Sequence, residues 1–89
     1  MTFEDMVPML PDGVDFKDIS TESYREYTFP GGDIITIESP VVLHVSESGG
    51  HYIVDNEGIA HYIPYKWIEL SWDNETGKRI SFVSPRSGR

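Results

Sequence analysis

Between residues 24 and 83, short apolar segments rich in β-branched and aromatic residues alternate with turns that contain glycine, proline or asparagine. Segments of this kind, recurring roughly every eight to twelve residues, are typical of antiparallel strands joined by short connections. The expected strands span residues 24–29, 34–38, 41–46, 51–55, 59–63, 67–72 and 79–83. The pattern predicts a mainly β protein, either a small antiparallel meander or a partly closed barrel of five to seven strands.

The N-terminal residues have the pattern of a short helix instead. Thr2 and Asp5 have the spacing of a capping box, in which each side chain accepts a hydrogen bond from the backbone of the other residue. Pro8 and Pro11 limit the helix to about two turns. Its apolar residues recur at helical spacing: Phe3, Met6, Val7 and Leu10. Residues 14–22, where acidic and apolar residues alternate, are expected to form an extended loop.

A chain of 89 residues is long enough for one small domain with a modest core. We assign residues 1–83 to a single β-domain and residues 84–89 to a disordered tail, because no apolar residue follows Val83. The absence of cysteine excludes disulfides and thiolate metal sites. No stretch resembles a signal peptide or a membrane span, so we expect a cytoplasmic protein without membrane contact.

The net charge of −8 comes from the first half of the chain. Residues 1–50 contain ten acidic and two basic residues, whereas residues 51–89 contain five of each. Such a field repels nucleic acid and attracts basic protein surfaces, so we expect a basic protein partner and no direct nucleic-acid binding. Improved solubility and mimicry of nucleic acid are the alternatives. The candidate partner-binding residues are Glu4, Asp5, Asp12, Asp15, Asp18, Glu22 and Glu26.

The tripeptide His-Tyr-Ile occurs twice, ten positions apart, around the sequence Asp-Asn-Glu-Gly. This arrangement predicts a β-hairpin with a three-residue loop, in which Gly58 adopts the left-handed conformation. Tyr52 then lies opposite Tyr62, and Ile53 lies opposite His61. If Ser46 pairs with His51 across the preceding turn, one face of the sheet becomes the core face, with Val41, Leu43, Val45, Tyr52, Val54, Ala60 and Tyr62.

The opposite face would then carry the three histidines of the chain, His44, His51 and His61. Three imidazoles on neighbouring strands are a candidate zinc site. No carboxylate on these strands is well placed to orient them, so partly exposed surface histidines are the favoured interpretation. We therefore expect no metal or other cofactor.

Tyr65 and Trp67 fall outside the alternation of the neighbouring strands. Because tyrosine and tryptophan bury a large area with few rotamers to restrict, both are candidate partner-contact residues, with core packing as the alternative. Aromatic residues and exposed strand edges also support a second hypothesis, a structural or assembly module that forms homo-oligomers.

The chain lacks the usual signatures of catalysis. No glycine-rich loop precedes a helix, and no serine lies in a nucleophile elbow. Asp12, Asp15 and Asp18 do not have the spacing of an EF-hand calcium loop. We therefore expect a protein that is not an enzyme.

The segment GGHYIVDNEGIAHYIPYKWIELSW, residues 49–72, contains the pattern H-x-I-x-D-x-x-G-x-x-H-Y-I-P-x-x-W. In this respect the chain resembles small uncharacterised acidic proteins encoded by phages and prophages. The resemblance implies a phage setting, in which small acidic proteins bind and divert host factors, including defence systems. It implies no catalytic residue.

Charge and resemblance together predict a non-enzymatic binding protein, a small acidic phage-type inhibitor that docks on a basic surface of a host or defence protein. An assembly module is the first alternative. A metal-binding or small-ligand-binding protein built on the three histidines is the second.

Overall fold

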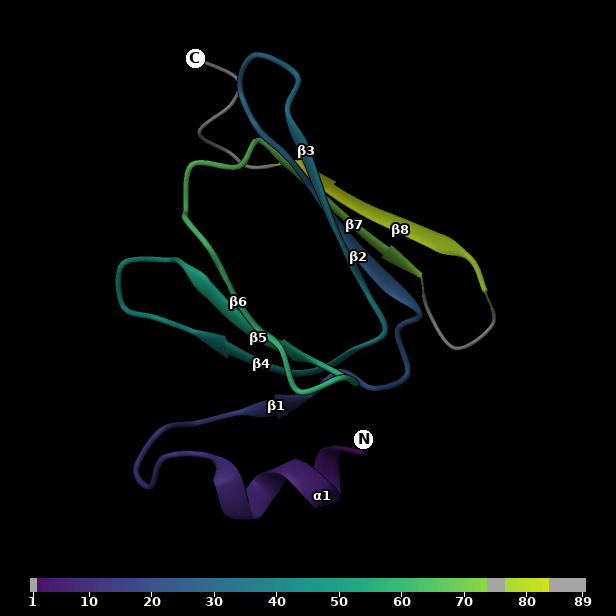
Figure 1. Ribbon diagram of the computed structural model, residues 1–89. Coiled ribbons are helices and arrows are strands. Elements are labelled where there is room, and N and C mark those ends of the chain that lie inside the picture. Colours follow the sequence, from purple (N-terminus) through teal and green to yellow (C-terminus); the bar gives the residue numbers. More distant parts are fainter. Residues whose placement is uncertain (1, 74–76, 84–89) are drawn as a thin grey trace.

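The computed structural model describes residues 2–73 and 77–83. In it the protein has three layers: one short helix and two four-stranded antiparallel sheets (Figure 1). Sheet A has the strand order β1 (Lys17–Asp18), β4 (Pro40–Val45), β5 (His51–Asp55) and β6 (Ala60–Ile63). Sheet B has the order β3 (Ile34–Glu38), β2 (Tyr24–Thr28), β7 (Glu69–Asp73) and β8 (Arg79–Val83). A mainly β fold with a short N-terminal helix is therefore confirmed. The predicted tail, residues 84–89, lies outside the described residues.

The described residues form eight strands, which exceeds the predicted five to seven, and they form no closed barrel. The additional strand is β1, in the segment predicted to be a loop, where Lys17 pairs with Leu43 of β4. Phe16 and Ile19 flank β1 and pack into different parts of the core, Phe16 beside the helix and Ile19 between the sheets. These two anchors hold the short segment between them extended along β4.

Three hairpins have the same three-residue loop. The residue before each loop donates its N–H to the carbonyl of the residue after it, at 2.8 to 3.0 Å: Phe29 to Asp33, Ser46 to Gly50, and Asp55 to Ile59. The last loop residue is a glycine with φ between 84° and 95° in each case: Gly32, Gly49 and Gly58. Glycine suits this position because the left-handed conformation costs it little. The prediction made for Gly58 is confirmed.

The register predicted for β5 and β6 is also confirmed, since Tyr52 lies opposite Tyr62 and Ile53 lies opposite His61. The register predicted between β4 and β5 is wrong by one residue, because His44 and not Val45 lies opposite Tyr52. The loop that ends at Gly49 has three residues, whereas a pairing of Ser46 with His51 requires four. A shift of one residue exchanges the two faces of one strand relative to its neighbour. Leu43 of β4 enters the core as predicted, so β5 and β6 are the strands that turn their other side to the core.

The predicted core face of β5 and β6 is consequently the outer face. Tyr52 and Tyr62 are 46% and 50% exposed, whereas Ile53 and Ile63 on the inner face are buried. The core between the sheets consists of Ile19, Tyr27, Ile37, Leu43, Ile53, Ile63, Trp67 and Leu70.

The helical layer covers part of the outer face of sheet A (Figure 1). It comprises α1 (Phe3–Met6) and the 3-10 turn η1 (Val7–Met9). The predicted capping box is present, with hydrogen bonds of 3.2 Å between Thr2 and Asp5 in both directions. A second apolar cluster joins this layer to sheet A, with Met6, Val41 and Val42 at its centre and Phe3, Leu10, Phe16 and Val54 around them.

Ser39 carries the chain from sheet B to sheet A, between β3 and β4. Its φ of 49° lies in the left-handed region, which residues other than glycine seldom adopt. Its N–H donates to the Ser23 carbonyl at 2.9 Å, and its carbonyl accepts from the Asn56 N–H at 3.0 Å. Pro40 restricts it further, because a residue before proline favours extended conformations. The crossover therefore stores backbone strain, which hydrogen bonds from both sheets offset.

Ser39→Gly should raise the free energy of unfolding by up to about 1 kcal/mol, because glycine relieves this strain by more than it adds in unfolded-chain entropy. Ser39→Val should lower it by about 1 kcal/mol or more, since a β-branched side chain fits a positive φ poorly. Urea denaturation followed by tryptophan fluorescence measures both changes. A glycine variant that is less stable than the wild type would contradict the strain.

Candidate functional site

A chain of polar side chains crosses the core between the two sheets. Arg25 on β2 forms a bidentate ion pair with Glu22, at 2.8 and 2.9 Å. The Nη1 atom of Arg25 donates to the Tyr27 hydroxyl at 3.3 Å, and this hydroxyl lies 2.7 Å from Nδ1 of His51 on β5. Because an arginine can only donate, the Tyr27 hydroxyl accepts from Arg25, and the same hydroxyl forms a second hydrogen bond with Nδ1 of His51.

Burial decides the charge state of each member of this chain. It raises the pKa of Tyr27 to about 12, against the opposing effect of Arg25. Burial lowers the pKa of His51 to about 4, and the Arg25 charge acts in the same direction. Burial works to lower the pKa of Arg25 and is the largest single effect, but the hydrogen bonds and charge interactions with Glu22 and Tyr27 together outweigh it, so the pKa is raised. None of Arg25, Tyr27 and His51 is more than 8% exposed, so these polar side chains connect the two sheets and offer no surface to a ligand.

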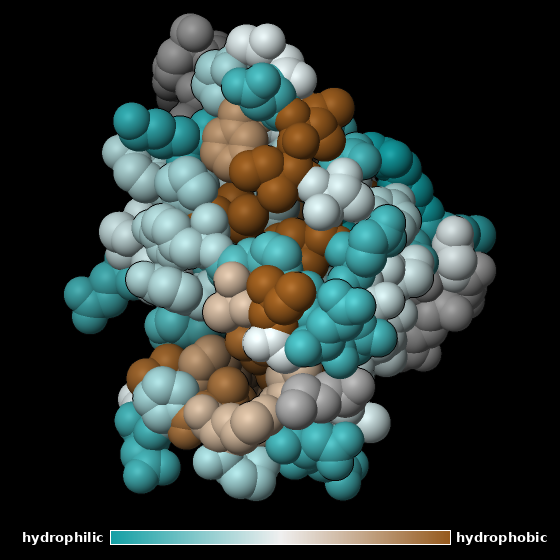
Figure 2. Space-filling model, in the orientation of Figure 1, coloured by the Kyte–Doolittle hydropathy of each residue, from teal (hydrophilic) through white to brown (hydrophobic). Residues whose placement is uncertain are grey.

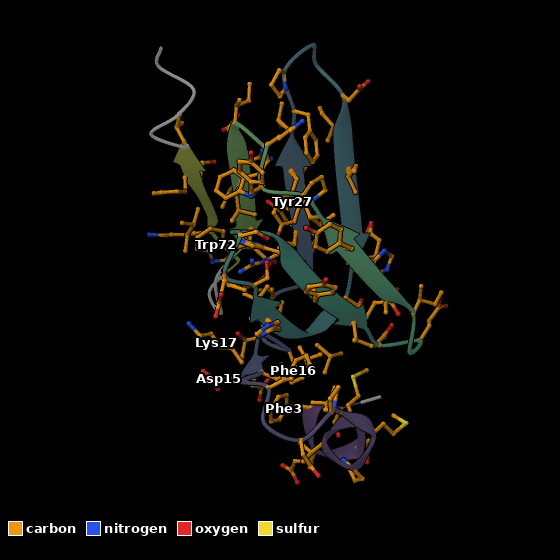
Figure 3. All side chains as sticks on the ribbon, turned by 90° about the vertical axis from the view of Figure 1, so that its left-hand side faces the viewer. Phe3, Asp15, Phe16, Lys17, Tyr27 and Trp72 are labelled. Carbon is orange, nitrogen blue, oxygen red and sulfur yellow. The ribbon has the colours of Figure 1, made fainter. Side chains whose placement is uncertain are left out.

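The helical layer carries a hollow of about 330 Å³, which we call the N-terminal hollow. It is lined by the apolar residues Phe3, Val7, Leu10, Val14 and Phe16, by Pro11 and Gly13, and by the acidic residues Asp12 and Asp15. Figure 3 shows Phe3 and Phe16 close together between the helix and sheet A, with Asp15 extending away from them. The Asp15 carbonyl accepts from Nδ1 of His44 on β4 at 2.9 Å, which fixes this loop to sheet A.

The seven acidic residues proposed from the sequence do not form one face. Four of them have partners within the fold: Asp5 with Thr2, Asp18 with Ser20, Glu22 with Arg25, and Glu26 with Arg79. Hydrogen bonds from Thr2 and Ser20 hold the pKa values of Asp5 and Asp18 below the usual range. Across residues 2–73 and 77–83, the carboxylates of Glu4, Asp12 and Asp15 have neither an ion-pair partner nor a hydrogen-bond partner.

This arrangement suits the side chain of a lysine or an arginine. Both have an apolar stem that packs on hydrophobic surface and a cationic head that stays at its edge. In the N-terminal hollow, Phe3, Val14 and Phe16 offer apolar contact for the stem, and Asp12 and Asp15 offer carboxylates for the head. Among the residues that the structure describes, no lysine or arginine lines the hollow and competes for them.

The three histidines are not brought together. His51 and His61 lie on the inner face of sheet A, but His44 lies on the outer face, where it packs against Phe16 and Tyr52. His61 is paired with Asp55 at 2.9 Å, and His51 belongs to the buried polar chain. The three-histidine site is therefore wrong, because it depends on the incorrect register of β4. The part of the chain that the structure describes contains no group of three or more potential metal ligands.

The two candidate contact aromatics differ in location. Trp67 is 7% exposed and packs against Tyr27 and His51 in the core, so its proposed role in partner contact is wrong. Tyr65 is 42% exposed, so its role in partner contact stays a prediction. The aromatic pair on the outer surface is Tyr52 and Tyr62, whose ring centroids are 4.7 Å apart.

Sequence reasoning missed the apolar walls of the N-terminal hollow. The signal was the alternation of acidic and apolar residues in the segment that begins at Asp12, which we interpreted as an extended loop. Val14 and Phe16 come between the acidic residues because the same segment covers sheet A and presents carboxylates to solvent. None of the helices among the described residues has the length and apolar character needed to cross a membrane.

The stability of the protein should fall between pH 6.5 and about pH 4 because of His51. In this window the unfolded chain binds a proton at this imidazole and the folded chain does not, so the free energy of unfolding decreases as the pH falls. The decrease amounts to roughly 3 kcal/mol over the window. Urea denaturation at several pH values measures it. His51→Gln should flatten this component, whereas the control His44→Gln should retain it; equal profiles for wild type and His51→Gln would contradict the assignment.

Comparisons of the chain with protein-family models, with curated proteins and with solved structures find no match.

Proposed function

We propose that this chain is a non-enzymatic binding protein whose N-terminal hollow receives a lysine or arginine side chain from the basic surface of a partner protein. The observation that supports the proposal is the combination, in one hollow, of apolar walls with two carboxylates that have no other partner among the described residues. Binding would bury the stem of the basic side chain and pair its charge, which gives both affinity and selectivity for a cation.

The charge of the whole chain supports the same partner. A net charge of −8 on 89 residues attracts a basic surface at long range and speeds the first encounter. This contribution is screened by salt, since the Debye length is only about 8 Å at physiological ionic strength. The contacts in the hollow are short-range and are screened less. The complex should therefore weaken with salt but not disappear at moderate ionic strength.

The kind of partner is proposed from the pattern in residues 49–72, which we interpret as a resemblance to small phage and prophage proteins. We propose a host protein, including the proteins of a defence system, whose basic functional surface this chain covers. Inhibition would then result from occupation of that surface and would need no chemical step.

Reversal of the two carboxylates in the hollow tests the proposal. Asp12→Lys combined with Asp15→Lys should weaken partner capture from the native host lysate at least about tenfold, because the cation then meets like charge. Neither carboxylate has a structural partner among the described residues, so the double variant should fold normally. Quantitative mass spectrometry of captured proteins at low and high salt is the measurement.

The matched control is Asp33→Lys combined with Glu47→Lys, which changes the net charge by the same amount outside the hollow, at one residue directly after a hairpin loop and one within another. This control should lose only the part of the affinity that depends on long-range attraction. If both double variants lose capture equally, the net charge and not the hollow determines binding. If the amount of captured protein is unchanged by salt and by both double variants, the proposal is refuted.

A further inference from the structure

Sheet B ends in two edge strands that are long and unprotected. β3 and β8 have five residues each, whereas the edge strand β1 of sheet A has two. Neither β3 nor β8 contains a proline, and each pairs with its neighbour without a bulge. Short strands, prolines and bulges are the usual devices that prevent edge strands from pairing with other chains. Within residues 2–73 and 77–83, both edges of sheet B are therefore open to a further strand.

The hydrogen bonds of the β2–β3 hairpin show which backbone groups of β3 are free. Phe29 donates to the Asp33 carbonyl and Ser39 donates to the Ser23 carbonyl, so the odd-numbered residues of this strand bond to β2. Backbone groups of successive residues point to opposite sides of a strand. The N–H and carbonyl groups of Ile34, Thr36 and Glu38 are therefore directed to the free edge.

The same alternation can be followed across the sheet to β8. On β2, the N–H and carbonyl groups of Tyr24, Glu26 and Thr28 are directed to β7, where Glu26 lies opposite Ser71 and Thr28 lies opposite Glu69. The alternate residues of β7, Leu70 and Trp72, therefore direct their backbone groups to β8. Their partners on β8 are Phe82 and Ile80. The remaining residues of β8 direct their backbone groups to the other free edge: Arg79, Ser81 and Val83.

These two edges fit each other in an antiparallel register. When Glu38 of one copy lies opposite Arg79 of another, Thr36 lies opposite Ser81 and Ile34 lies opposite Val83. All three pairs bring free backbone groups of both strands together, so each pair can exchange two hydrogen bonds. Their side chains lie on the outer face of sheet B, where they match an acid with a base, two hydroxyls, and two apolar residues.

The inner face matches in the same register. Ile37 lies opposite Ile80, and Ile35 lies opposite Phe82, in continuation of the core between the sheets. Ile35 and Phe82 are 41% and 48% exposed, although both point inward. Figure 2 shows that hydrophobic residues reach the surface in a band on one face of the molecule. A further strand at each edge of sheet B would cover Ile35 at one edge and Phe82 at the other.

We propose that β3 of one copy pairs with β8 of a second copy in this register, so that sheet B continues from molecule to molecule. The surface is independent of the N-terminal hollow, which lies on the other side of sheet A. The contact joins two different edges, so it is head-to-tail and leaves one free edge at each end of an assembly. Association should therefore continue beyond the dimer as the concentration rises.

Sedimentation velocity over a concentration series up to roughly 1 mM tests the association. The average mass of the wild-type chain should rise with concentration and pass that of a dimer. A chain that stays monomeric over the whole series, or that stops at a dimer, would overturn the proposal.

A charge exchange tests the register. Glu38→Arg places two arginines opposite each other at the contact, and Arg79→Glu places two acids there, so either variant alone should associate at least about tenfold more weakly than the wild type. An equimolar mixture restores opposite charges at every contact between the two variants and should recover the association. Failure of the mixture to recover, or unchanged association of the single variants, would overturn the register.

A third variant does not disturb the pairing of Arg79 with Glu26. Thr36→Pro removes an N–H that points to the free edge and leaves the hydrogen bonds between β2 and β3 in place. It should abolish association, whereas the matched Thr36→Val, which keeps the N–H, should associate like the wild type. Association of Thr36→Pro at the wild-type level would show that another surface is used. Capture experiments on the N-terminal hollow are unaffected by these variants, so the two proposals can fail separately.

Discussion

The hydroxyl of Tyr27 joins the two sheets in the middle of an otherwise apolar core. It accepts a hydrogen bond from Arg25 of its own sheet and forms another with His51 of the other sheet. A guanidinium can be buried here only because Glu22 neutralises it, since an unpaired buried charge would be very costly. Because every member needs its neighbour, a slip of either strand by one residue would leave buried polar groups without partners. The network thus selects one register of the sheets as much as it stabilises the fold.

The hydrogen bonds between the sheets explain why the local elements of the fold were predictable from the sequence and the core face of β5 was not. The hairpin at Gly58 and the helix cap at Thr2 are local, and their residues determine them within a few positions. The face of β5 that enters the core was not predictable from hydrophobicity, because Tyr52 and Tyr62 are larger and more apolar than His51 and His61. His51 is buried because a tyrosine and an arginine from sheet B meet it. The sequence alone does not reveal these partners, because they meet His51 only when the two sheets pack together.

The site was predicted with the same mixed result. Acidic residues are easily counted, but whether a carboxylate serves the fold or a partner depends on groups distant in the sequence, such as Arg79 for Glu26. Recognition of a second glycine loop at Gly49, by the rule that succeeded at Gly58, would have corrected the register of β4. It would also have separated His44 from the other histidines. Trp67 was misplaced because it lies in the connection between β6 and β7, which runs from one sheet to the other (Figure 1).

The order of the strands has a consequence for how the chain folds as it is synthesised. Strands β4, β5 and β6 follow one another along the chain and pair with their immediate neighbours, so this part of sheet A can form as soon as its residues are available. Strand β2 is made much earlier than β7, its partner in sheet B, and all of sheet A is made between them. Contacts so distant in sequence form slowly because the intervening loop must first be closed. Arg25 and Tyr27 therefore reach their final environment only after the second half of the chain has been made. Until then, the β2–β3 hairpin has no partner at the edge of β2 that later pairs with β7.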